Sequence, residues 1–329
     1  MRARTFGRLG RDASEIGFGA WQIGADWGEV DEDDAMATLH AAADAGVTFF
    51  DTADVYGDGR SERLVGRFAH DRAAAGNPIF VATKMGRRVE QTVANYTPEN
   101  FRAWNDRSRE NLGVETLDLV QLHCPPTDLY YRPEVFEELE AMVAEGRIAA
   151  YGVSVERVEE GLKALEYPGL ASVQIVFNAF RQRPAQLFLR EAAGRGVGVI
   201  ARVPLASGLL SGRYTRETSF GPDDHRNFNR HGEQFDVGET FAGVPLEVGL
   251  EAVEELRELV PADATPAQFA LRWILMHDGV STVIPGARSP EQAGANAAAS
   301  DLPELGEATM ARVGEIYARR IAPHVHQRW

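Results

Sequence analysis

The sequence has one cysteine, fewer basic than acidic residues, and no long apolar run. Cys124 is the single cysteine in 329 residues, so no disulfide can form within the chain, as is typical of a reducing compartment. With 34 Lys and Arg against 49 Asp and Glu, the net charge is −15, which argues against a nucleic-acid or anionic-membrane partner. No apolar run reaches the roughly 18 residues of a membrane span, and none of signal-peptide length follows Met1. We therefore expect a soluble cytoplasmic protein.

Short apolar segments alternate with longer amphipathic ones along the chain, which is typical of repeated βα units around a parallel sheet. The clearest helix start and stop signals bound residues 31–45, 133–145 and 265–277. Eight segments have strand character: residues 16–22, 47–52, 79–84, 117–123, 150–154, 172–177, 197–203 and 281–285. Single barrels of this kind often exceed about 250 residues. We therefore predict an α/β fold, a (β/α)8 TIM barrel forming a single domain over residues 1–329.

Two segments of the sequence are additional to the strands and helices of a minimal (β/α)8 barrel. Residues 213–244 form a long loop after the seventh predicted strand, and loops of this length are usually functional or disordered. We expect this loop at the rim formed by the carboxyl ends of the strands. The tail, residues 319–329, carries His324 and His326, but two histidines without a third ligand make a poor metal site. We therefore predict no metal and a docked or frayed tail.

Three predicted strands end in polar residues that suit acid–base chemistry. Asp51 ends the second strand, and Tyr56 follows it in the next loop. Lys84 and His123 end the third and fourth strands. The carboxyl ends of barrel strands meet at one rim, so these side chains should converge. A phenol has an ordinary pKa of about 10, so Tyr56 could donate a proton near neutrality only beside a cation.

The expected convergence gives each of these residues a role. Lys84 would lower the pKa of Tyr56, and Asp51 would hold and neutralise Lys84. His123 would orient a substrate oxygen toward the phenol. Any one such residue at a strand end is more often a surface residue or a satisfied core group. Four of them on three consecutive strand ends are hard to attribute to chance.

At this point the sequence resembles the aldo-keto reductase family over nearly its whole length, and specifically a bacterial-type member. The matching motifs are Gly17-Phe18-Gly19-Ala20-Trp21, residues 51–57 with Ser61-Glu62, Lys84, Gln121-Leu122-His123, Gly152-Val153-Ser154, Val173-Gln174, residues 204–210 and residues 284–289. The resemblance implies a (β/α)8 barrel that binds NADPH without a Rossmann fold. It also implies hydride transfer to an aldehyde or ketone, or from an alcohol or sugar in reverse, with Tyr56 as general acid and base.

The resemblance places the nicotinamide against Ser154 and Gln174, which match the residues that hydrogen-bond its carboxamide. The asparagine expected after the serine is Val155, so one polar contact is lost. Where the family commonly stacks an aromatic ring on the nicotinamide, this chain has Arg202. A guanidinium can also stack on a flat ring. The alternative is that Arg202 pairs with a carboxylate across the barrel mouth.

Residues 203–213 resemble the family's pyrophosphate-binding loop, where small residues let backbone amides approach phosphate. Arg288 falls where the family holds the 2′-phosphate of adenosine, beside a helix that opens at Ser289 and whose N-terminus favours an anion. Many members carry a lysine where this chain has Gly286, so Arg288 would supply most of the charge, which favours NADPH over NADH. The other expected cofactor contacts are Gly19, Ala20, Trp21, Asp51, Val203, Pro204, Leu205, Ser207, Gly208, Leu210, Arg213, Gln292 and Asn296.

The resemblance implies that the substrate is a small carbonyl compound or alcohol, and we expect its pocket to be lined by Trp21, Trp27, Tyr56, Met85 and His123. Such an apolar, aromatic wall suits an aromatic or alkyl aldehyde, or a sugar stacked on a ring. The residues do not choose among these substrates.

Two other functions stay open. One is a regulatory subunit, similar to family members that sense the redox state of the nucleotide while turning over slowly. The other is a cofactor-free lyase or isomerase with Lys84 as a Schiff base, which would leave the phosphate-binding loops unexplained. The Gly-x-Gly-x-x-Ala match at residues 196–201 does not indicate a dinucleotide fold, because it follows a predicted helix and enters a strand.

Overall fold

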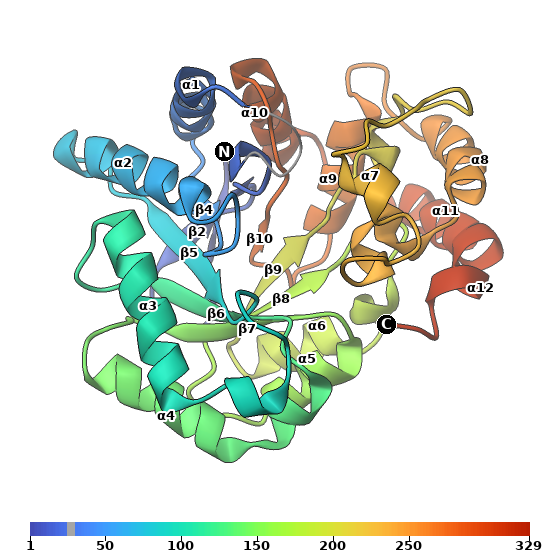
Figure 1. The fold of residues 1–329 in the computed structure, drawn as a ribbon. Coiled ribbons are helices and arrows are strands. Elements are labelled where there is room, and N and C mark those ends of the chain that lie inside the picture. The colour runs from blue at the N-terminus through green and yellow to red at the C-terminus, as the bar shows by residue number, and fades with distance from the viewer. Residues whose placement is uncertain (25–29) are drawn as a thin grey trace.

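The computed structural model describes residues 1–24 and 30–329, and it confirms the predicted barrel (Figure 1). Eight parallel strands pair with their neighbours in chain order from β3 to β10. Ile16, just before β3, bridges to Val283 in β10, which closes the ring. Each strand overlaps a predicted one: β3 (Phe18–Gly19), β4 (Phe49–Asp51), β5 (Phe80–Met85), β6 (Leu119–His123), β7 (Tyr151–Val155), β8 (Ser172–Val176), β9 (Gly198–Arg202) and β10 (Thr282–Val283).

Helices surround the strands on the outside of the barrel (Figure 1). Three of them, α1 (Glu32–Asp44), α4 (Pro133–Ala144) and α9 (Pro266–Leu275), confirm the helices predicted from start and stop signals. Thr265 and Gln268 form a reciprocal capping box at the start of α9. In the described part of the chain, no helix has the length and apolarity to cross a membrane. Further helices are α2 (Arg60–Ala74), α3 (Pro98–Leu112), α5 (Val158–Ala164), α6 (Phe188–Gly194), α8 (Leu246–Arg257), α10 (Pro290–Ala297) and α11 (Glu307–Ile316).

A short hairpin that the sequence did not reveal closes the bottom of the barrel. Strands β1 (Ala3–Thr5) and β2 (Asp12–Ser14) pair antiparallel. Phe6, between them, stacks on Phe49 with ring centroids 5.4 Å apart and meets Phe80 edge to face at 5.2 Å. Because Phe49 and Phe80 are the first residues of β4 and β5, the hairpin seals the amino ends of the strands. The opposite, carboxyl end is left for a site.

The long segment 213–244 contains short helices where the sequence showed no periodicity: α7 (His225–Phe228), η6 (Val237–Glu239) and η7 (Phe241–Gly243). It lies beside α8 and α9 (Figure 1). The tail forms α12 (Ala322–Val325) and is docked, since Trp329 is buried and its Nε1 donates to Asp236 at 2.9 Å. Trp329 thereby joins the tail to the long segment.

Candidate active site

The carboxyl ends of three neighbouring strands bring Asp51, Lys84 and His123 to one rim. The loop between β4 and α2 adds Tyr56. Lys84 Nζ lies 2.5 Å from Asp51 Oδ2 and 3.3 Å from the Tyr56 hydroxyl oxygen, and it donates to the Thr52 carbonyl at 2.9 Å. The Tyr56 and His123 rings meet edge to face with centroids 5.9 Å apart. The four residues singled out from the strand ends thus form one contiguous group.

Lys84 is fully buried and nevertheless charged. Burial lowers the pKa of Lys84, but attraction to Asp51 and Tyr56 outweighs this effect and places the pKa above its ordinary value. Asp51 is fixed in turn, because its Oδ1 accepts hydrogen bonds from Gln174 at 2.8 Å and from Gln121 at 3.4 Å. The ion pair is therefore held in one geometry behind the phenol.

The pKa of Tyr56 is raised, whereas the sequence led us to expect a lowered pKa. Burial raises the pKa most, the cation of Lys84 lowers it as predicted, and the carboxylates of Asp51 and Glu239 raise it again, so the pKa lies above its ordinary value. The sequence showed the cation but not the depth at which the phenol is buried. Tyr56 therefore stays protonated at neutral pH, which is the form that a proton donor needs.

His123 is held in its uncharged form. Burial lowers its pKa well below the ordinary value, and repulsion by Arg87, Lys84 and Arg202 lowers it further. Its Nδ1 is buried without a hydrogen-bond partner among the residues that the structure describes. A neutral imidazole can hydrogen-bond a neutral carbonyl oxygen without competing with Tyr56 for the proton.

The loop that carries Tyr56 is fixed by close backbone packing. Gly57 has a φ of +56°, and a Cβ at this position would lie 1.8 Å from the Gly24 carbonyl oxygen, so glycine is required. Ser61, in the first turn of α2, donates to the Ala20 carbonyl at 2.8 Å. These contacts join the end of β3 to the loop and α2, and they set the position of the phenol.

A cavity of about 540 Å³ opens at this rim and extends from the group around Tyr56 to α10. Asp51, Tyr56 and His123 line it, whereas Lys84 is buried behind them. The residues expected at a cofactor and found in its lining are Gly19, Trp21, Asp51, Ser154, Gln174, Arg202, Val203, Pro204, Leu205, Ser207, Gly208, Arg213, Gly286, Arg288, Gln292 and Asn296.

A few of the expected site residues lie elsewhere. Ala20 and Leu210 are buried in the hydrophobic core, and Ser289 caps α10 by accepting a hydrogen bond from the Gln292 backbone at 3.3 Å. Met85, expected in the substrate pocket, also packs in the core. It follows Lys84 on β5, and successive strand residues point to opposite faces, so its side chain turns away from the cavity. Trp27 lies outside the described residues.

Other lining residues were not singled out from the sequence: Gln22, Ser211, Tyr214, Arg226, Glu239, Thr265, Ala267, Gln268, Ile284, Pro285, Glu291 and Ala295. Tyr214, Arg226 and Glu239 come from segment 213–244. The length of that segment was the only signal that pointed to them.

The turn after β9 has an unusual backbone. Val203, Ala206 and Ser207 have φ values of +51°, +47° and +54°, and non-glycine residues in this conformation cluster at functional sites because other contacts must hold them there. Ser207 Oγ donates to the Glu239 carbonyl at 3.0 Å and accepts from the Phe241 backbone at 3.1 Å. Segment 213–244 therefore fixes the turn that is expected to meet a pyrophosphate.

The cavity fits a nicotinamide cofactor. Within the described chain, Arg202 Nε and Gln22 Oε1 are buried without a hydrogen-bond partner, and the contact of Ser154 Oγ is with the Cys124 thiol at 3.4 Å. These groups are available to a polar ring substituent. At the far end, Arg288 and the N-terminus of α10 supply positive charge for a phosphate.

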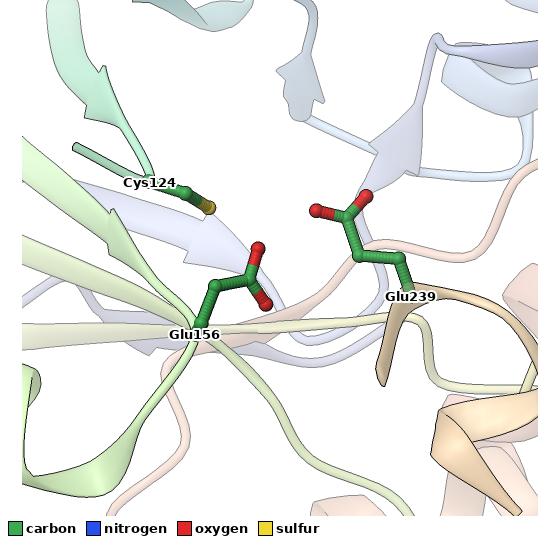
Figure 2. A group of neighbouring side chains, drawn as sticks. All are labelled: Cys124, Glu156 and Glu239. Carbon is green, nitrogen blue, oxygen red and sulfur yellow. The ribbon is translucent and has the colours of Figure 1, made fainter. Parts of the chain in front are cut away.

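Arg202 is held by carboxylates, which is the alternative considered from the sequence. It lies 2.9 Å from Glu156 and 3.6 Å from Glu239, and Arg87 contacts the same carboxylates at 3.2 and 3.0 Å. Figure 2 shows Glu156 and Glu239 beside Cys124. Two carboxylates and a thiol resemble metal ligands, but Arg87 and Arg202 already contact both carboxylates. Burial also raises the pKa of Cys124 to about 12, so its thiol stays protonated.

Comparison with known proteins places this barrel in a class. Residues 15–318 match the model of the Aldo/keto reductase family. The chain is 30% identical over 297 residues to the aldo-keto reductase YhdN of Bacillus subtilis, covering 89% of this chain and 86% of that one. It is 25% identical over 316 residues to the aldo-keto reductase yakc of Schizosaccharomyces pombe, whose name specifies NADP(+), with coverage of 94% and 90%.

Among solved structures, the glycerol dehydrogenase AKR11B4 from Gluconobacter oxydans superimposes with a TM-score of 0.78 and 31% identity, over 97% of this chain and 96% of that one. The chain belongs to the aldo/keto reductase family. It is therefore an oxidoreductase of a family that acts on carbonyl compounds or alcohols.

Proposed function

We propose that this protein is an NADP(H)-dependent reductase of aldehydes or ketones that also oxidises the corresponding alcohol or sugar. The observation that carries the proposal is the buried Lys84–Asp51 pair behind Tyr56, with the phenol facing the cavity. The positive charge of Arg288 at the far end of the cavity supports the phosphorylated cofactor, as does the name of the NADP(+) relative.

The cofactor, when bound, supplies the hydride. Tyr56 donates the proton of its hydroxyl to the substrate oxygen, and Lys84, 3.3 Å from that hydroxyl, stabilises the phenolate that remains. His123, which is uncharged, orients the substrate oxygen by a hydrogen bond. Trp21 lies along the Tyr56 ring with centroids 5.9 Å apart and forms an apolar wall beside the reacting carbonyl.

The remaining lining residues hold the cofactor along the cavity. Ser154 and Gln174 bind the carboxamide of the nicotinamide. The turn after β9 binds the pyrophosphate through its backbone and Ser207. Arg288 binds the 2′-phosphate, and Asn296, which donates to the Gly286 carbonyl at 3.2 Å, keeps the loop beside the adenosine in place.

Tyr56→Phe tests the proposal, with Tyr131→Phe as the matched control because Tyr131 is exposed and does not line the cavity. Titration with NADPH, followed by cofactor fluorescence, should give equal affinities for the wild type and both variants. Turnover of an aldehyde should fall by about 10²- to 10⁴-fold in Tyr56→Phe alone, since general acid catalysis is typically worth that much. Near-normal turnover of Tyr56→Phe would refute the assignment.

The same assays separate the other two functions. Absence of NADPH binding would leave the cofactor-free lyase or isomerase, whereas binding without turnover of any substrate would leave the regulatory subunit. The substrate panel should include hydroxy-aldehydes that correspond to polyols, because one structural relative is a glycerol dehydrogenase.

A further inference from the structure

Four charged side chains form a closed network beside the nicotinamide end of the cavity. Arg87 follows β5, Glu156 follows β7, Arg202 ends β9, and Glu239 lies in η6. Each guanidinium contacts both carboxylates, and none of the four side chains is more than 18% exposed. Arg202 and Glu239 line the cavity together with Asp51, Tyr56 and His123. The proposed reaction uses none of this network as a proton donor.

The two carboxylates of the network lie close enough to compete for one proton. Oxygens of Glu156 and Glu239 are within 4.8 Å of one another (Figure 2), so ionisation of one carboxylate disfavours ionisation of the other. Burial, together with repulsion by Glu239, outweighs the attraction of Arg202 and raises the pKa of Glu156 to about 7. Burial would also raise the pKa of Glu239, but Arg87 and Arg202 attract its carboxylate and hold the pKa below its ordinary value. The shared proton therefore belongs to Glu156.

The field of this network reaches the reacting centre. The charge of Glu239 raises the pKa of Tyr56, and the charges of Arg87 and Arg202 lower that of His123. A charge that enters the cavity between these groups must interact with the network to a similar degree. The ring of the oxidised nicotinamide carries such a positive charge, whereas the reduced ring is neutral.

On the basis of the function proposed above, we propose that Glu156 and Glu239 set the preference of this site between oxidised and reduced cofactor, because binding of the cationic nicotinamide expels the proton that they share. With Glu156 protonated, two guanidinium groups face one carboxylate, and a third positive charge is repelled. Loss of the proton to solvent restores two carboxylates against two guanidinium groups. The affinity for NADP⁺ relative to NADPH therefore rises with pH.

The groups around the pair do not titrate in the same range. Those facing Glu156 and Glu239 are Arg87, Cys124, Tyr130, Glu160, Arg181, Arg202, Tyr56 and His225. Burial raises the pKa of Cys124 to about 12 and lowers the pKa of Arg181 to about 9 and of His225 to about 4. Burial also raises the pKa of both tyrosines. A proton released around pH 7 upon binding is thus assigned to Glu156.

Calorimetric titration of the full chain with NADP⁺ and with NADPH, in two buffers of different ionisation enthalpy at about pH 7, counts the protons released. We expect about half a proton more for NADP⁺ than for NADPH, since Glu156 is about half protonated at a pH equal to its pKa. The 2′-phosphate titrates in both cofactors and cancels in this difference. Between about pH 6 and pH 8, the ratio of the NADP⁺ Kd to the NADPH Kd should fall by up to about tenfold per pH unit.

Glu156→Gln should abolish both the extra proton and the pH dependence of the ratio. Glu159→Gln is the matched control, because Glu159 is an exposed glutamate on α5 that pairs with Arg183, and it should behave as the wild type. Asp54→Asn should also leave the extra proton unchanged, which separates Glu156 from Asp54, whose pKa is similarly raised to about 7.

Equal proton counts for the two cofactors in the wild type would overturn the inference, even if Glu156→Gln fails to fold. An extra proton that persists in a folded Glu156→Gln variant would overturn it as well. If neither cofactor binds, the proposed function itself fails, so the two failures are distinguishable.

Discussion

Asp54 is buried close to Tyr56 without a partner for its carboxyl group. Its backbone N–H donates to the Lys84 carbonyl at 3.1 Å, but both carboxyl oxygens are buried without a hydrogen bond to any described residue. Burial, with repulsion by Glu62, outweighs attraction to Arg88 and Arg107 and raises the pKa of Asp54 from 3.8 to about 7. The folded protein therefore binds this proton more tightly than the unfolded chain does.

Because of this difference, the contribution of Asp54 to the stability of the protein falls as pH rises. The contribution of Asp54 to the free energy of unfolding decreases between the unfolded pKa of 3.8 and the folded pKa of about 7 and then levels off. At 1.36 kcal/mol per pKa unit, the loss is about 4 kcal/mol above pH 7. Asp54→Asn replaces the carboxyl group with a neutral amide of the same shape. We expect equal stabilities at about pH 4 and a variant more stable by up to about 4 kcal/mol at pH 8.

Urea denaturation of the wild type and Asp54→Asn across this pH range measures the difference. Asp58→Asn is the control, because Asp58 is exposed, pairs with Arg88 and Arg107, and has a pKa below its ordinary value. Its removal should not stabilise the protein as pH rises. A stability difference for Asp54→Asn that is the same at pH 4 and pH 8 would refute the argument from burial.

Three further outcomes follow from the site. Arg288→Ala should weaken NADPH by about 1.5–3 kcal/mol and NADH much less, as measured by fluorescence titration, because only NADPH has the 2′-phosphate; equal losses would place Arg288 elsewhere. Lys84→Met should lower stability by about 3–5 kcal/mol in thermal or urea unfolding and abolish turnover, since it leaves the Asp51 carboxylate buried alone; an unchanged unfolding midpoint would contradict the pairing. Because the pKa of Tyr56 lies above its ordinary value, kcat for reduction should not decline until the pH exceeds about 10, and a decline in the profile near neutral pH would contradict this.

The barrel strands could be predicted because each combines an apolar run with a polar residue at its carboxyl end. Asp51, Lys84 and His123 occupy such ends, and the barrel topology alone makes them converge. The β1–β2 hairpin escaped prediction because its strands have three residues each, too few for a period of two to stand out. Its place depends on Phe6 packing against the starts of two distant strands, which no local pattern shows.

The surroundings of Arg202 could not be predicted for a related reason. The sequence showed that an expected aromatic residue was missing, and it left stacking and ion pairing open. The choice depends on Glu156, which follows a different strand, and on Glu239, which lies in a segment without periodicity. Only the path of segment 213–244 over the rim brings Glu239 within 3.6 Å of the guanidinium.

Burial also explains why the groups at the rim differ in charge although they lie within a few ångströms of one another. Lys84 and Asp51 are 2.5 Å apart, so their attraction outweighs the desolvation of Lys84 and keeps its pKa above the ordinary value. Burial, together with the charges of Asp51 and Glu239, outweighs the attraction of Lys84 for a phenolate at Tyr56. Burial and the nearby cations disfavour a charged imidazole at His123, so both groups are neutral. A neutral donor and a neutral imidazole suit an uncharged carbonyl. The charge that must develop on the phenol during proton transfer is then stabilised by a lysine already fixed and desolvated, which requires no reorganisation at the moment of reaction.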